Sequence, residues 1–191
     1  ATVVTHFRND QGIDFRYLSP LNEPQWDWNT KRQEGCRFSS ADIKKLIDEL
    51  SQALSQRDLE TEILINESGT HADLTGAAGA NYNYAYDFFD PASPHFIGKN
   101  DNIRGTVSSH SYWSDKPGQL TYIRQAVSDA LADYQMGYAQ TEYCILGSEG
   151  PGLDLGMDPA LRLARTVHYD LAVGQTDTWE WWLAVSPHDY K

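Results

Sequence analysis

The sequence predicts an α/β fold in which helices cover a parallel sheet, forming the C-terminal part, about strands 4 to 8, of a (β/α)8 TIM barrel. Strand-like and helix-like stretches alternate along the chain, and the strands are apolar on both faces. Polar and aromatic residues gather after the strands, where barrels carry their sites. No glycine-rich nucleotide fingerprint follows any strand, which favours a barrel over a doubly wound sheet.

Five strands and five helices are expected. Residues 1–10 resemble the end of a helix, stopped before Gly12, and Ser39 or Ser40 is expected to cap the second helix. Apolar residues at three- and four-residue spacing mark the buried stripes of the longer helices. The remaining helices are expected at about 40–57, 78–90, 119–133 and 159–174. The strands are expected at about 14–21, 62–67, 103–109, 137–141 and 178–185.

The length limits how much of a barrel the chain can form. Five strands cannot close an eight-stranded barrel, and such barrels typically need about 250 residues, whereas this chain has 191. We therefore expect residues 1–191 to be one partial barrel domain whose first three strands precede Ala1.

Composition excludes some partners. A net charge of −12 and a pI near 4.7 disfavour DNA, RNA and anionic membranes, whereas a neutral polymer is not repelled. Six Trp and eleven Tyr can supply flat side chains that stack on sugar rings. No run is long enough to cross a bilayer, and Cys36 and Cys144 permit one disulfide at most. We expect no cofactor, and the sequence does not indicate an oligomeric state.

Two glutamates end expected strands. Pro24 stops the first strand and leaves Glu23 at its tip, and Glu142 follows the fourth strand in the same way. Hydrolysis of a glycosidic bond needs an acid at the leaving oxygen and a second carboxylate at the anomeric carbon. Glu23, with Trp26 nearby, suits the acid, and Glu142, which can face Tyr112, suits the nucleophile.

Other polar residues have weaker claims. Asn66 and Glu67 repeat the strand-end pattern, although a solvated strand end explains them as well. His71 and His188 lack metal-ligand spacing with their acidic neighbours and are expected at the surface. No metal site is therefore expected, although six histidines leave a metallohydrolase as a possible alternative.

Ordered motifs carry a family resemblance. Asn22-Glu23-Pro24, His110-Ser111-Tyr112 and Glu142 resemble the clan of retaining glycosidases with (β/α)8 barrels. The longer strings at 19–26, 33–36 and 140–144 resemble glycoside hydrolase family 30 and, within it, the endo-β-1,6-galactanase branch. The resemblance spans nearly the whole chain, from Phe15 to Val185.

The resemblance implies roles for individual residues. Glu23 would be the acid/base, Glu142 the nucleophile, and Asn22 the residue that hydrogen-bonds the sugar 2-hydroxyl. The residues expected to contact substrate are Asn22, Trp26, His110, Tyr112, Trp179 and Trp182, of which Trp182 would form the floor of the subsite. One of the three tryptophans at 179, 181 and 182 is expected in the core. The resemblance also implies an accessory β-sandwich, absent from this chain, and a secreted, periplasmic or cell-surface location.

The function expected from these observations is retaining hydrolysis of a β-linked polysaccharide, in the manner of an endo-β-1,6-galactanase. A glucosylceramidase-like or xylanase-like specificity is the alternative within the same chemistry. A sugar-binding module without turnover is the alternative of a different class. Sugar, linkage and exo or endo action are left open.

Overall fold

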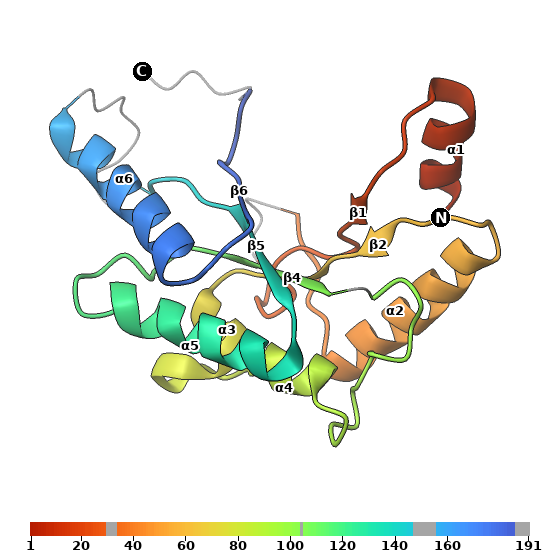
Figure 1. Cartoon of the computed structure of the whole chain (residues 1–191), viewed down its shortest axis with the longest axis horizontal. Coiled ribbons are helices and arrows are strands. Elements are labelled where there is room, and N and C mark those ends of the chain that lie inside the picture. Colours follow the sequence, from red (N-terminus) through yellow and green to blue (C-terminus); the bar gives the residue numbers. More distant parts are fainter. Residues whose placement is uncertain (30–33, 104, 147–155, 186–191) are drawn as a thin grey trace.

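The computed structural model describes residues 1–29, 34–103, 105–146 and 156–185, and these ranges contain two groups of parallel strands (Figure 1). Strands β1 (Tyr17–Leu18) and β2 (Glu62–Ile63) pair with each other. The other four form one sheet in chain order: β3 (Ile65–Ser68), β4 (Thr106–His110), β5 (Gly137–Glu142) and β6 (Thr178–Trp179). Parallel neighbours in chain order require a crossover between successive strands, which is the predicted α/β arrangement.

Helices occupy the crossovers. The helical elements are α1 (Thr2–Gln11), α2 (Ser40–Ser55), α3 (His71–Thr75), the 3-10 turn η1 (Ala77–Gly79), α4 (Tyr84–Phe89), α5 (Leu120–Tyr134) and α6 (Met157–Ala172). Figure 1 shows α2, α4 and α5 below the strands and α6 beside β6. Helix α3 packs against both α4 and α5. The sheet therefore has a helix-covered side and an opposite side that carries the cleft described below.

The core lies between the strands and these helices. Ile65 and Val107 contribute from the sheet, and Ile47, Phe88 and Val127 from α2, α4 and α5, all at 1% exposure or less. Burying side chains of this size contributes roughly 1.5–3 kcal/mol each, so this layer fixes where the strand ends lie.

Helix α2 begins where the sequence predicts. The Ser39 hydroxyl accepts a hydrogen bond from the Asp42 N–H at 3.2 Å, and the Asp42 carboxylate accepts one from the Ser39 N–H at 3.3 Å. Ser39, rather than Ser40, is therefore the cap, and the pair forms a capping box.

Three of the five expected strands are shorter than predicted or divided. Residues 14–21 pair only at Tyr17–Leu18, residues 178–185 only at Thr178–Trp179, and the strand expected at 62–67 is divided between two sheets. The division falls at Leu64, whose N–H donates to the carbonyl of Leu18. A run of apolar residues indicates that the segment is buried, and it does not show that the segment hydrogen-bonds to a neighbouring strand. Strands predicted from such runs are therefore too long.

One helix was not anticipated. Helix α3 begins at His71 and is capped by Thr70, whose hydroxyl accepts a hydrogen bond from the Asp73 N–H. The helix predicted at 78–90 is confined to Tyr84–Phe89. His71, expected at the surface, lies in α3 at 0% exposure, so that expectation is wrong. His188 lies outside the described residues.

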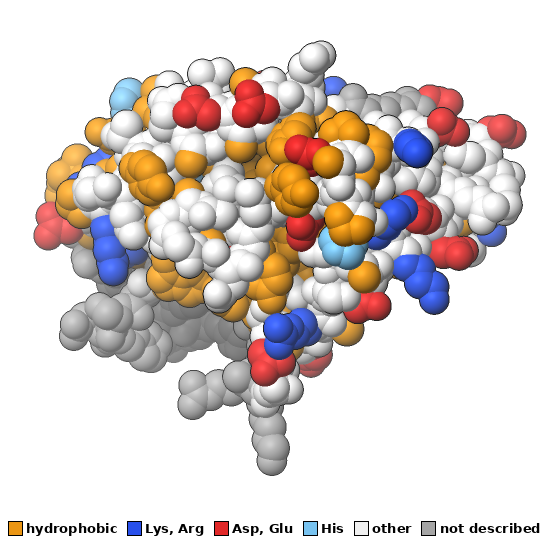
Figure 2. Space-filling view, turned by 90° about the horizontal axis from the view of Figure 1, so that it is seen from below, with side chains coloured by type: hydrophobic (Ala, Val, Ile, Leu, Met, Phe, Trp, Pro, Cys, Tyr) orange, Lys and Arg blue, Asp and Glu red, His pale blue; other side chains and the backbone are white. Residues whose placement is uncertain are grey.

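The surface has mixed character. On the face in Figure 2, hydrophobic side chains form patches among polar ones, and acidic and basic side chains are scattered. Among the described residues, no helix combines the length and the hydropathy needed to cross a bilayer. Cys36 and Cys144 are free thiols.

Candidate functional site

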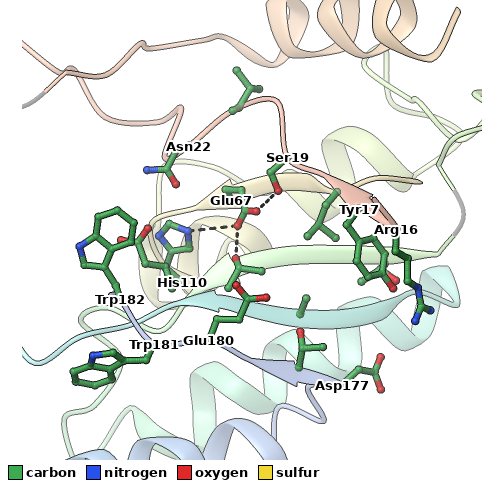
Figure 3. A pocket seen from close by; sticks show the side chains of 17 residues that line it. Arg16, Tyr17, Ser19, Asn22, Glu67, His110, Asp177, Glu180, Trp181 and Trp182 are labelled. Atoms are coloured by element: carbon green, nitrogen blue, oxygen red, sulfur yellow. Dashed lines mark hydrogen bonds and ion pairs between the residues drawn. The ribbon is translucent and has the colours of Figure 1, made fainter. Parts of the chain in front are cut away.

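A cleft of about 690 Å³ runs along the open side of the strands (Figure 3). Arg16 and Asp177 lie at one end, and Asn22 and Trp182 lie toward the carboxyl ends of the strands. Glu67, His110 and Glu142 line it as well, each from a different strand. The cleft thus collects side chains from elements that are far apart in the chain.

The two glutamates predicted at strand ends meet across His110, although Glu23 lies beyond the end of β1 and only Glu142 ends a strand. A carboxylate oxygen of Glu23, a ring nitrogen of His110 and a carboxylate oxygen of Glu142 all lie within 4.8 Å of one another. The register of β4 against β5 shifts at this point, so that His110 faces Glu142. Such irregularities re-aim side chains at strand ends. Glu23 does not line the cleft itself, and His110 is the group that joins it to the cleft.

Glu23 is held in an uncommon backbone conformation. Its φ of 44° lies in the left-handed region, which non-glycine residues rarely occupy. Its N–H donates to the Glu67 carbonyl at 2.8 Å, and its own carbonyl accepts from the Trp28 indole at 3.0 Å. Gly69 lies against its carboxylate, because a Cβ on Gly69 would stand 2.9 Å from Glu23 Oε1. Glu23, whose side chain is 11% exposed, therefore has little freedom to move.

Glu142 ends β5 with both its backbone and its side chain bonded. Its carbonyl accepts from the Ser111 N–H at 3.3 Å and from the Gln140 amide at 2.5 Å. The Tyr112 hydroxyl donates to Oε1 at 3.1 Å, and no hydrogen bond to Oε2 is found among the described residues. Burial raises the pKa of Glu142, while the charge of His110 and the Tyr112 hydrogen bond act in the opposite direction.

His110 lies between two carboxylates. Its Nδ1 is 3.0 Å from Glu23 Oε1, and its Nε2 is 3.5 Å from Glu67 Oε2. Burial alone would lower the pKa of His110, but Glu23, Glu67 and the charge of Glu142 raise it to about 9. At neutral pH this ring is therefore an imidazolium that donates from both nitrogens.

Glu67 is the residue whose place in the site the sequence indicated only weakly. The Ser19 and Thr141 hydroxyls donate to its carboxylate, which lies at the centre of the contacts drawn in Figure 3. Burial raises the pKa of Glu67, but donation from His110, Ser19 and Thr141 outweighs burial and holds that pKa below its usual value. The sequence signal for Glu67 is that the pair Asn22-Glu23 recurs as Asn66-Glu67.

The aromatic candidates divide between the cleft and its surroundings. Trp182, 51% exposed, lines the cleft together with Trp181, which the sequence had not selected. Trp26 instead packs edge-on against Trp113, with ring centroids 5.7 Å apart. Trp179 donates its indole N–H to buried Asp170 at 2.8 Å. Neither Trp26 nor Trp179 lines the cleft.

Glu23, His110 and Glu142 are the one group of three metal-type ligands found in the described part of the chain. Both nitrogens of His110 face carboxylates, and a doubly protonated ring has no lone pair for a metal. The arrangement therefore fits proton transfer better than metal binding.

The chain resembles known sequences and structures. The family model described as O-glycosyl hydrolase family 30 matches residues 1–191. A conserved exported protein from Bacteroides fragilis is 30% identical, with a TM-score of 0.86 over 97% of this chain and 40% of that chain. No curated protein matches.

Two further structures share the fold at 14% identity. A family 30 endoxylanase from Clostridium papyrosolvens aligns over 95% of this chain and 38% of its own, with a TM-score of 0.57. The catalytic domain of a family 30 xylanase C from Talaromyces cellulolyticus aligns over 96% of this chain and 36% of its own, with a TM-score of 0.60. The chain thus spans 40% or less of each of these three structures, which is consistent with the predicted part of a barrel.

Proposed function

The chain belongs to O-glycosyl hydrolase family 30, and from this we propose that it carries the catalytic pair of a retaining glycosidase, with Glu23 as acid/base and Glu142 as nucleophile. The observation that supports the pairing is the approach of their carboxylate oxygens within 4.8 Å. Retaining enzymes place the two carboxyl groups about 5–5.5 Å apart, whereas inverting enzymes need roughly 6.5–9.5 Å to admit a water.

The first displacement forms a covalent intermediate. Glu142 Oε2 attacks the anomeric carbon as the bond to the leaving oxygen breaks, and Glu23 gives its proton to that oxygen. Tyr112 hydrogen-bonds Oε1 of Glu142, and His110 hydrogen-bonds Oε1 of Glu23, so within the described part of the chain the second oxygen of each carboxyl group is available for these tasks. The positive charge of His110 supports the ionised state that Glu142 needs for attack.

The second displacement reverses the roles. Glu23, now a carboxylate, takes a proton from a water that attacks the anomeric carbon, and the bond to Glu142 breaks. The sugar leaves with its original anomeric configuration, and both glutamates return to their starting states. His110 faces Glu23 throughout and can stabilise its carboxylate between the two steps.

For the substrate we propose a neutral, β-linked polysaccharide, with β-1,6-galactan as the first choice on the motif resemblance. Asn22, Trp181 and Trp182 are proposed to contact the sugars, because they line the cleft and combine an amide with flat rings. Xylan is the alternative, because two of the similar structures are described as xylanases. Secretion is proposed as well, since the relative from Bacteroides fragilis is described as exported.

The direct test follows sugar release by the full-length protein that contains this chain. Wild type is expected to release reducing ends from β-1,6-galactan, and Glu142→Gln should lower the rate by at least about 1,000-fold. Glu49→Gln, an exposed position on α2, serves as control and should be unchanged. Hydrolysis by Glu142→Gln at the wild-type rate would exclude the proposal, and binding without release would indicate a sugar-binding module.

Azide distinguishes the two roles. With an aryl β-glycoside, Glu23→Ala should still form the covalent intermediate, which azide then opens to the β-glycosyl azide. Glu142→Gly should instead give the α-glycosyl azide, because azide displaces the aryloxide directly. The opposite products would exchange the roles of Glu23 and Glu142.

A further inference from the structure

Glu67 contacts the neighbours of both proposed catalytic residues. Its carbonyl accepts from the Glu23 N–H at 2.8 Å. Its carboxylate accepts from Thr141, the residue before Glu142, and from Ser19 on the segment that leads to Glu23. One residue at the end of β3 thereby spans the two segments that deliver the glutamates.

The same carboxylate also faces His110. Glu67 Oε2 lies 3.5 Å from Nε2, on the side of the ring opposite Glu23. His110 is 1% exposed and Glu67 is 7% exposed, so water does not substitute for either partner. With the Glu67 carboxylate on one side and an accepting oxygen of Glu23 on the other, the ring keeps both protons and points Nδ1–H at Glu23 Oε1.

Other charged groups surround this pair. Glu142 acts on His110 from β5, and buried His71 of α3, whose pKa burial lowers, is neutral beside it. Glu180, which follows β6, lies close enough to Glu67 that the two affect each other. Among these groups Glu67 is the one that contacts Nε2, while Glu142 contributes charge at a longer distance.

We propose that Glu67 is a positioning residue for the proposed glycosidase reaction: its carboxylate holds His110 as an imidazolium against Glu23 and fixes the segments that carry Glu23 and Glu142. The inference rests on the proposed function. Glu67 touches neither the anomeric carbon nor the leaving oxygen in this scheme and acts through His110. A buried ion pair that only stabilises the fold would predict different behaviour in the variants below.

Two substitutions of Glu67 distinguish the effect of its negative charge from the effect of where its side chain reaches. Glu67→Gln keeps the length of the side chain and one acceptor oxygen, so it can accept from Ser19 or from Thr141 but not from both, and it removes the charge that faces Nε2. Its kcat should fall about 10- to 100-fold with a smaller change in KM, since misplaced groups slow the chemical step more than binding. Glu67→Asp keeps the charge but shortens the side chain, so His110 should stay protonated while kcat still falls.

The decisive readout is the imidazole of His110, followed by ¹⁵N NMR during a pH titration of the full-length protein. Wild type should titrate near pH 9, Glu67→Asp close to it, and Glu67→Gln shifted toward the ordinary value of about 6.5. The kcat deficit of Glu67→Gln should then be smaller at pH 6 than at pH 8, because acid restores the imidazolium. A purely structural role would lower stability and leave this pH dependence unchanged.

Glu49→Gln again serves as the control and should match wild type in both measurements. An unchanged His110 titration in Glu67→Gln, or a wild-type kcat in a folded variant, would overturn the inference. If Glu67→Gln does not fold, Glu67→Asp decides, and a wild-type kcat there would overturn it too. Failure of the glycosidase proposal is distinguishable, because it shows as hydrolysis by Glu142→Gln, whereas the NMR titration does not depend on turnover.

Discussion

The N–H of Glu23 donates to the carbonyl oxygen of Glu67 over 2.8 Å, and both residues have left-handed backbones, with φ of 44° and 52°. Left-handed conformations cost about 1–3 kcal/mol each at non-glycine residues and persist where the surroundings over-determine them. The hydrogen bond joins the two left-handed residues, so the segment that carries Glu23 and the end of β3 hold each other in place. This arrangement directs the Glu23 side chain at His110.

The Tyr112–Glu142 hydrogen bond should set the acid limb of the pH–rate profile. In the proposed mechanism Glu142 must be ionised to attack, so activity should fall as the pH drops through the pKa of Glu142, which burial has already raised. Tyr112→Phe removes a donor to the carboxylate and should move this limb of kcat/KM to higher pH by about one to two units. Tyr122→Phe, an exposed tyrosine on α5, is the control. An acid limb that stays in place or moves to lower pH would contradict the assignment.

His110 should make stability fall as the pH rises from neutral to alkaline. Its pKa is about 9 in the folded protein and about 6.5 in an unfolded chain. The extra stability is therefore fully present below pH 6.5 and is lost as the pH rises through 9. Urea unfolding at pH 6, 7.5 and 9 measures it, with His110→Gln as the comparison. The slope should be shallower in His110→Gln, and equal slopes would show that His110 does not contribute.

Gly69 should tolerate no side chain without disturbing the site. A Cβ there would stand 2.6 Å from Trp26 Nε1 and 2.9 Å from Glu23 Oε1. Gly69→Ala must push one of them aside, so kcat should fall about 10- to 100-fold, as misplaced catalytic groups do. Gly118→Ala, where a Cβ would meet nothing within 4 Å, should keep wild-type activity. Equal kcat in the two variants would show that the Glu23 carboxylate is free to move.

Sequence reasoning predicted the elements whose signal is local. The Ser39 cap and the apolar stripe of α2 follow from neighbouring residues, and Glu142 falls at the end of β5 as predicted. The break between β2 and β3 depends on partners far away in the chain, because one pairs with β1 and the other with β4. The apolar character of residues 62–67 does not reveal which strand each half pairs with.

The site was predictable in part for the same reason. The strand-end rule selects Glu142, which does end β5, and Glu23, which lies beyond the end of β1 at Leu18. The contact of Glu67 with His110 depends on how adjacent strands are staggered. Alternation along the strand predicted at 178–185 does not decide which face each tryptophan takes. Only tertiary packing places Trp179 against Asp170 and Trp181 in the cleft.

Asp170 of α6 is a buried carboxylate with four donors. The Arg124 Nε–H donates at 2.6 Å, the Ser111 hydroxyl at 2.7 Å and the Trp179 indole at 2.8 Å. His71 Nε2 lies 3.2 Å away and donates as well, which leaves Nδ1 to accept from the Tyr138 hydroxyl. Asp170 thus ties α6 to α3, α5 and the segments after β4 and in β6.

Asp170→Asn should be among the most destabilising single changes in the chain. It removes the charge that balances Arg124, and breaking a buried ion pair costs about 3–5 kcal/mol. Urea unfolding measures the loss, and the exposed Asp158 at the start of the same helix provides the control, since surface changes usually stay within about 0.5 kcal/mol. Because the carboxylate also holds Trp179 and Ser111, the indole N–H resonance of Trp179 should shift in Asp170→Asn and not in Asp158→Asn. A loss below about 1 kcal/mol, small beside that expected for a broken buried pair, would mean that Arg124 finds another acceptor and that the network is not a unit.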